Sequence, residues 1–193
     1  MAVKLTEQEI QELRDLKTLP DDDNIRWKEH IKQRLLNNRK LIHIIDNKEL
    51  EEADAEPDDY YGINILPYFI IHPTQSASNN YLCYEIQFSE EARYNSVIKI
   101  AEIIFYCMSE QKGIIEDTTY VARHDLMAAM VKDEFNWTNI FGCQVHLVSD
   151  KPSVTDNDYA TRTLIFEGEM PNNLVKTRSG RTYTVNGYVI NDP

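Results

Sequence analysis

Two adjacent segments carry the strongest hydrophobic pattern in the chain, and together they predict a pair of antiparallel strands. Apolar side chains alternate with other residues from Tyr81 to Phe88, which is the pattern of a half-buried strand. Val97 to Met108 is apolar on both faces except at Lys99 and Glu102. These two charges differ in parity, so a bulge or a helical segment stays open, although the many β-branched and aromatic residues favour a regular strand. The intervening SEEARYNS predicts an extended loop that joins the two strands.

The N-terminal part of the chain has the pattern of helices. Thr6 and Glu9 have the spacing of a capping box, which marks the start of a first helix. Every fourth residue from Trp27 to Leu35 is apolar, which predicts the buried face of a second helix. The pair Asn37-Asn38 either starts a short third helix or only kinks the second one. The predicted helical ranges are 5–17, 24–36 and 39–46.

The rest of the chain adds one helix and several β-segments. Pro67 interrupts the apolar stretch Ile63–Ile71, so this stretch is predicted as an edge strand or an extended packed segment. Asp125–Phe135 has the pattern of a helix, with a carboxylate near its start. Two further strands, 143–148 and 159–169, are predicted to form a hairpin around a turn at 152–158. The predicted fold is α+β, with a mainly antiparallel sheet of about four strands packed with helices, N-terminal helices and a C-terminal β-rich arm.

Charge divides the chain. The formal net charge is −12, with 32 acidic residues against 20 lysines and arginines, which argues against a dedicated nucleic-acid binder and against docking on anionic membranes. After Pro171 the balance changes, because Lys176, Arg178 and Arg181 are opposed by Asp192 alone. We therefore predict an N-terminal helix and linker (1–23), an α+β domain (24–170) and a basic C-terminal arm or hairpin (171–193).

The longest acidic stretch, residues 46–59, holds eight acids and one lysine. It lacks the alternating ligands, the central glycine and the closing glutamate of an EF-hand, so it is predicted to be a solvated loop rather than a calcium site. Three cysteines, far apart in the sequence, lack metal-ligand spacing and are predicted to be small buried side chains in a reducing compartment. No metal and no cofactor is expected.

The sequence carries no catalytic signature. Its six glycines are too scattered for a dinucleotide-binding or phosphate-binding loop. The triplet Arg123-His124-Asp125 invites a catalytic interpretation, but no nucleophile motif accompanies it, and helix capping with an Arg–Asp pair is the favoured interpretation. His146 is expected to be a surface or interface residue. We therefore expect that the protein is not an enzyme.

The order of the predicted elements resembles that of the neck proteins of tailed bacteriophages, which include tail terminators, tail-completion proteins and head–tail joining proteins. ILPYFIIHPTQ leads into the antiparallel pair, ARHDLMAAMVKDEF supplies one helix, and GCQVHLVSD with TRTLIFEG supplies the closing pair. The resemblance covers residues 24–169. It leaves out the first helix and the arm after Pro171.

This resemblance implies a structural virion protein that assembles in the bacterial host cytoplasm as a homo-oligomeric ring, often a hexamer. Such rings cap the tail tube or join it to the connector beneath the capsid. The implied partners are other copies of the chain, tail-tube protein and connector proteins, with DNA passing through unbound and no membrane involved. The start MAVKLTEQEIQELRD has no apolar signal region, which agrees with a cytoplasmic route.

Two sets of surface residues follow from the ring hypothesis. The basic arm is expected to contact the acidic stretch of the next subunit, in a head-to-tail interface that closes by rotation. Glu85 and Glu102, on the less apolar face of the strand pair, are expected to face the channel or a neighbour. The interface residues are Lys176, Arg178 and Arg181 on the arm, with Glu51, Glu52, Asp54, Asp58 and Asp59 on the acidic stretch. The alternative is an acidic cytoplasmic adaptor or inhibitor that binds a basic protein.

Overall fold

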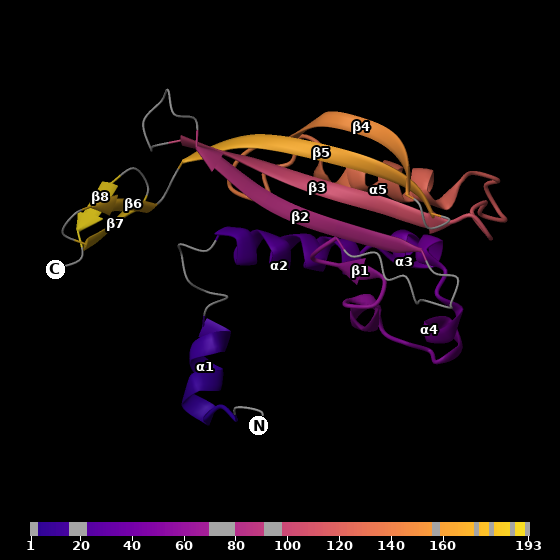
Figure 1. The fold of residues 1–193 in the computed structure, drawn as a ribbon, viewed down its shortest axis with the longest axis horizontal. Coiled ribbons are helices and arrows are strands. Elements are labelled where there is room, and N and C mark those ends of the chain that lie inside the picture. Colours follow the sequence, from indigo (N-terminus) through magenta and orange to yellow (C-terminus); the bar gives the residue numbers. More distant parts are fainter. Residues whose placement is uncertain are drawn as a thin grey trace.

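One sheet, with strand order β1-β2-β3-β5-β4, organises the body of the protein (Figure 1). The computed structural model describes residues 4–15, 23–69, 80–90, 98–155, 159–171, 174–177, 180–185 and 188–191. The five strands are β1 (Ile65–Leu66), β2 (Tyr81–Glu90), β3 (Ile98–Glu110), β4 (His146–Thr155) and β5 (Tyr159–Pro171). Only β1 runs parallel to its neighbour within this sheet. The predicted α+β fold is confirmed, and the additional strand is the short edge strand that precedes Pro67.

The central strand β3 is regular along its whole length. Its pairing runs without a register shift from Tyr81↔Met108 to Glu90↔Lys99 on the β2 side, and it is equally continuous along β5. The bulge and the helical segment are therefore excluded. Lys99 and Glu102 differ in parity because they lie on opposite faces, and Lys99 sits 4.4 Å over the Phe88 ring at the sheet end.

Three helices pack on one face of the sheet: α2 (Asp23–Leu36), α3 (Arg39–Ile45) and α5 (Arg123–Phe135). α2 lies against β2, and α5 lies against β3 and β5. The periodic stripe of α2 is buried as predicted, and Trp27 stacks on Phe141 with ring centroids 4.3 Å apart. Asn38 caps α3 by accepting a hydrogen bond from the Leu41 backbone N–H, so the third helix is a separate one.

Helix α1 (Glu7–Asp15) has the predicted capping box but none of its residues is buried. The Thr6 backbone N–H donates to Glu9 Oε2 at 2.7 Å, and the Glu9 N–H donates back to Thr6 Oγ1 at 3.3 Å. Figure 1 shows α1 standing apart from the sheet and its helical layer. Local capping therefore stabilises this helix without tertiary burial.

The predicted turn at 152–158 is wrong for its first residues. Strand β4 continues to Thr155, and Pro152 pairs with Arg162 of β5. Proline is tolerated there because β4 is an edge strand. On the side of β4 that has no neighbouring strand, the missing N–H removes no hydrogen bond of the sheet. The strand also begins at His146 rather than 143, and a register shift lies between Leu147 and Ser149. The β4–β5 hairpin itself is confirmed.

The acidic stretch is not an irregular loop. It contains helix α4 (Lys48–Glu52) and a 3-10 helix, η2 (Pro57–Tyr60). Asn47 caps α4, and the Glu56 backbone N–H donates to Asp59 Oδ2 at 2.9 Å. Acids in first turns complement the partial positive charge of a helix start, so part of this charge serves local structure.

A chain of buried asparagine amides joins the helices to the sheet. Asn47 Nδ2 donates to Asn64 Oδ1 at 2.7 Å, Asn64 Nδ2 donates to the Asn80 carbonyl, and Asn80 Nδ2 donates to the Ile45 carbonyl, both at 2.9 Å. Each buried amide thus satisfies a group of the next element. The chain fixes α3 against the start of β2.

After β5 the chain forms a second sheet of three antiparallel strands, not a simple hairpin. These are β6 (Leu174–Thr177), β7 (Gly180–Val185) and β8 (Tyr188–Asn191). Figure 1 shows this small sheet beyond the end of β5. The predicted division of the chain at residues 23 and 170 remains a prediction.

Candidate functional site: the open face of the sheet

The two faces of the large sheet differ in what covers them. Side chains on the same face of the sheet as Phe105 meet the helices and form the core. Tyr84, Ile103 and Leu164 are among them, and none of the three is exposed to solvent. On the opposite face, which we call the open face, no helix of the described residues packs against the four long strands. Where the subunit's own chain does not cover them, the side chains there are therefore available for contacts outside the subunit.

One end of the open face is acidic. Glu102 lies opposite Gln87 on β2 and opposite Glu167 on β5, and Glu167 in turn lies opposite His146 on β4. Gln87 Nε2 donates to Glu102 Oε2 at 2.6 Å. Glu169 extends the same face of β5. We call Glu102, Glu167 and Glu169 the acidic end; like charges directly opposite each other cost stability, so folding alone does not explain Glu102 and Glu167.

The other end of the open face is aromatic and is covered by the chain around β1. Phe69 lies on the Tyr106 ring, with centroids 4.4 Å apart, and Tyr81 lies edge-on to Tyr159 at 5.9 Å. Together with Leu66, Cys83 and Met108 they form a second, smaller apolar cluster. This end is closed by the subunit's own residues and differs from the acidic end in both chemistry and exposure.

Glu85 and Glu102 both lie on the open face, but in different surroundings. Alternation predicted this for Glu85, whereas it left open whether Lys99 or Glu102 lies there. Glu85 accepts hydrogen bonds from the Phe69 backbone N–H at 3.4 Å and from the Tyr106 hydroxyl at 3.5 Å. Burial, with the Glu85 charge, raises the pKa of Tyr106. Glu85 thus binds the β1 segment, whereas Glu102 belongs to the acidic end; whether either faces a channel stays a prediction.

Sequence reasoning missed Glu167 and Glu169. The signal was present, because the apolar residues Leu164 and Phe166 mark the inward face of the predicted strand 159–169, and strand alternation then places residues 165, 167 and 169 on the opposite face. His146 was expected at the surface. Its ring is half-buried and stacks on exposed Trp137, with centroids 5.3 Å apart.

The predicted arm–loop contact is not tested by the described residues. Glu51, Glu52, Asp54, Asp58 and Asp59 are all exposed, on the side of the molecule that carries α4. Arg178 lies outside the described residues, as do the side chains of Lys176 and Arg181. The proposed contact therefore remains a prediction about assembly.

Residues of the Arg123-His124-Asp125 triplet link α5 to other parts of the fold. Arg123 is buried; it donates to the carbonyls of Ile44 and Gly113, each at 3.1 Å, and pairs with Asp46 at 3.0 Å. The Arg–Asp pair expected within the triplet is therefore wrong, because Arg123 pairs with Asp46 at the end of α3. The helix begins at Arg123, two residues earlier than predicted, and its N-cap Ala122 makes no side-chain cap bond. Burial lowers the pKa of His124.

Asp125 instead joins an ion cluster that ties α5 to the β4–β5 hairpin. Arg162 donates to both carboxylate oxygens of Asp150 at 2.7 Å and to Asp125 Oδ1 at 2.8 Å, and Lys132 lies 2.9 Å from Asp150. The Arg162 hydrogen bonds lower the pKa of Asp150 to about 2. Each of the four charged groups has a partner of opposite charge within the cluster, so we interpret the cluster as structural support.

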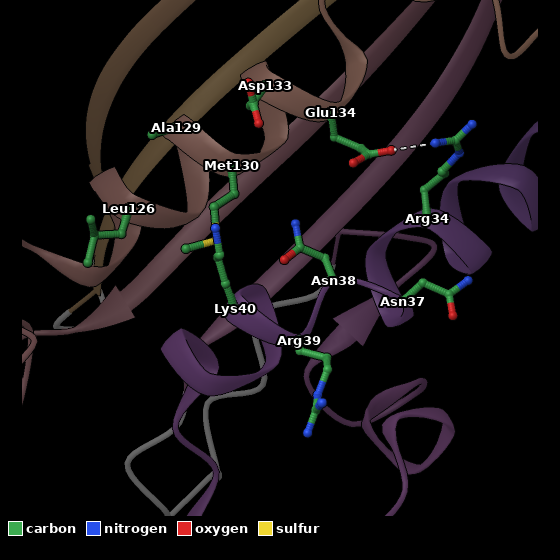
Figure 2. A pocket seen from close by; sticks show the side chains of 10 residues that line it. All are labelled: Arg34, Asn37, Asn38, Arg39, Lys40, Leu126, Ala129, Met130, Asp133 and Glu134. Atoms are coloured by element: carbon green, nitrogen blue, oxygen red, sulfur yellow. Dashed lines mark hydrogen bonds and ion pairs between the residues drawn. The ribbon is translucent and has the colours of Figure 1, made fainter.

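A groove lies on the helical side of the molecule, between the α2–α3 junction and α5, with a volume of about 830 Å³. Figure 2 shows basic side chains from α2 and α3 on one wall and acidic side chains from α5 on the other. One ion pair, Arg34 to Glu134 at 2.9 Å, crosses it. Leu126, Ala129 and Met130 of α5 also line it. The groove holds no convergent set of catalytic groups.

Within the described residues, no group of three or more His, Cys, Asp or Glu side chains is arranged to hold a metal ion. No described helix is both long and apolar enough to cross a membrane.

Comparison with known proteins places the chain in a family. The family model described as YomW matches residues 35–167, which leaves out α1, nearly all of α2, the end of β5 and the C-terminal strands. No curated protein sequence matches. A chain of a solved structure titled "Virion of native gene transfer agent (GTA) particle" is similar, with 12% identity and a TM-score of 0.46, over 72% of this chain and 90% of that one; a likeness this distant carries no functional argument. Because the family model spans more than half of the sequence, the protein belongs to the YomW family.

Proposed function

We propose that this protein is a structural component of a phage-like virion, which forms a ring around the DNA channel at the head–tail junction. The observation that carries the proposal is the acidic end of the open face, where Glu102 and Glu167 lie directly opposite each other without an internal cation between them in the register. A ring needs such a surface, because a negatively charged lumen repels DNA phosphates and keeps a passing duplex from adhering.

The body of the subunit suits a rigid ring. A continuous sheet with a helical layer on one side is stiff, and the Arg162 cluster fixes α5 to the β4–β5 hairpin. The edges of the sheet and the C-terminal strands offer separate surfaces for neighbouring copies. In this arrangement the protein acts as a tail terminator or head–tail joining protein, without enzymatic activity, and contacts tail-tube and connector proteins.

The basic arm supplies the closing contact in this proposal. Lys176, Arg178 and Arg181 of one copy would meet the exposed acids of 46–59 on the next copy, which gives a head-to-tail interface. Such a contact between exposed charges weakens with salt, because the screening length falls to about 3 Å at 1 M ionic strength.

Sedimentation velocity of the full chain at increasing concentration tests the proposal. We expect a species several times the 22.5 kDa of one chain, most simply six, whose population falls as salt rises. Deleting residues 171–193 should reduce assembly at low salt. A chain that stays monomeric or dimeric at all concentrations, also with tail-tube or connector protein present, would contradict the ring and favour the acidic adaptor, which the same surface charge would serve.

A further inference from the structure

We infer that the groove between the α2–α3 junction and α5 receives helix α1 of a neighbouring copy of the same chain. This inference rests on the proposed self-assembly and names one surface by which it occurs. It starts from two features that the fold leaves unexplained: an amphipathic helix with no buried residue, and a groove with apolar side chains of α5 in its lining.

Helix α1 presents an apolar stripe to solvent. Ile10 and Leu13 are 38% and 54% exposed, and Leu5, just before the helix, is 45% exposed. A helix of nine residues is too short to be stable alone in water, even with its capping box, and is ordinarily held by packing of its apolar side. The stripe therefore calls for an apolar partner surface.

The groove matches α1 in length and in surface type. Its α5 wall runs from Leu126 to Glu134, about 12 Å along the helix axis, and α1 is about 13.5 Å long. Leu126 and Met130 are only half-buried, and Ala129 between them is small enough for a helix to approach closely. An amphipathic helix laid in an apolar groove is a common mode of recognition.

The charges of the two surfaces are complementary. α1 carries four acids and one arginine. The α2–α3 wall carries Arg34, Arg39 and Lys40, of which Arg39 and Lys40 make no ion pair with any described residue. At about 100° per residue, Glu9 and Arg14 lie on opposite flanks of the apolar stripe. One orientation therefore places Glu9 near Lys40 and Arg14 near the acidic α5 wall.

The chain geometry favours a neighbour's groove over the subunit's own. α1 is connected to the start of α2 at Asp23, whereas the groove lies beyond the other end of α2, about 20 Å away along its 14 residues. The seven residues 16–22 span at most about 25 Å, so docking within one subunit would use nearly the whole reach of the connection. Docking between copies carries no such restriction.

The contact is small, since one nine-residue helix buries much less than the roughly 1,200 Å² of a stable protein pair. It gains strength when every subunit both gives and receives one helix, because ring closure makes the last contacts intramolecular. We therefore expect α1 to set the concentration at which the ring assembles, and not the folding of the body.

Two variants of the full chain test this expectation by sedimentation. Ile10→Asp with Leu13→Asp puts two charges on the stripe, and we expect the concentration for half-assembly to rise at least about tenfold. The matched control, Gln8→Asp with Gln11→Asp, adds the same charges on the opposite face of α1. It should change the concentration for half-assembly less than about twofold. Equal effects from both variants would overturn the inference.

Cysteine cross-linking separates this contact from ring formation as such. In a Cys143→Ser background, we expect copies with Leu13→Cys and copies with Met130→Cys to form a disulfide-linked pair when mixed, and the Gln11→Cys control to form none. If rings form without this cross-link, the α1 inference fails and the proposed function stands. If neither rings nor the cross-link form, both fail. A double variant that cross-links only within one chain would assign α1 to its own subunit's groove and overturn the inference.

Discussion

The two faces of the same sheet obey different rules, although they share every strand. On the helical face, side chains such as Phe105 and Leu164 are fully buried and packed among aromatic neighbours. On the open face, neighbouring positions of the same strands carry Glu102 and Glu167 in direct opposition. Burial dictates the first face and the aromatic end of the second, whereas nothing in the folded subunit requires the acidic end. The difference indicates that the acidic end is shaped by what it meets outside the subunit.

The largest loss of stability is expected when a buried side chain on the helical face is shortened. Phe105→Ala removes a fully buried ring that lies 5.0 Å from Phe135 and 5.7 Å from Phe166, and should lower the free energy of unfolding by about 3–5 kcal/mol. Urea denaturation measures this. Ile104→Ala, one residue away on the open face, is the matched control and should cost about 1 kcal/mol. Similar losses for the two variants would contradict the contrast between the faces.

A smaller effect is expected from the ion cluster that clamps the hairpin. Arg162→Ala removes three short hydrogen bonds and leaves Asp150 without its bidentate partner, so we expect a loss of about 1–3 kcal/mol. Arg34→Ala, which breaks a single pair on an exposed side chain, should cost no more than about 0.5 kcal/mol in the same denaturation experiment. If Arg162→Ala costs as little as Arg34→Ala, the cluster is not the clamp we describe.

Acid should weaken the fold through two carboxyl groups. Hydrogen bonds from Arg162 lower the pKa of Asp150 to about 2, and hydrogen bonds from Thr118 and Thr119 lower the pKa of Glu116 to about 2. A carboxyl whose pKa is lower in the folded state stabilises the fold above its unfolded pKa, and this contribution is lost as pH falls towards the folded pKa. The free energy of unfolding should therefore drop between roughly pH 5 and pH 2. Asp150→Asn should flatten that drop; an unchanged pH profile would contradict the assignment.

The smallest effect on stability is expected at the acidic end. Glu102→Gln keeps an acceptor for Gln87 and removes the repulsion from Glu167, so stability should change by no more than about 0.5 kcal/mol, towards stabilisation. Assembly should persist, while duplex DNA retained by Glu102→Gln/Glu167→Gln assemblies in a filter assay should increase. Glu29→Gln/Asp117→Asn removes as much charge outside the acidic end and outside the proposed subunit contacts, and serves as the control. Equal retention by both double variants would argue against a lumenal acidic end.

The helical face could be predicted from the sequence because buried positions recur with the period of a helix or a strand. The stripe from Trp27 to Leu35 and the alternation in β2 place the core residues correctly. Alternation also places Glu85 on the open face, and applied to β5 it would have found Glu167. These features depend on neighbours a few residues apart, which a sequence pattern records.

Other features depend on contacts between distant segments, and no local pattern records them. In the sequence, Pro152 indicates a turn. Only the order of the strands shows that it lies in an edge strand, β4. The link from Arg123 to Asp46 joins residues of two helices that become neighbours only in the fold. The groove of Figure 2 exists because α5 lies beside the α2–α3 junction, so its lining is scattered over the sequence.

Electron microscopy of the assembled full chain tests the central claim most directly. We predict closed annuli with an open lumen, in which class averages and a reconstruction place the open face, with Glu102 and Glu167, against the lumen. Single subunits or dimers under assembling conditions would contradict the account, as would rings whose lumen is lined by α2, α3 and α5.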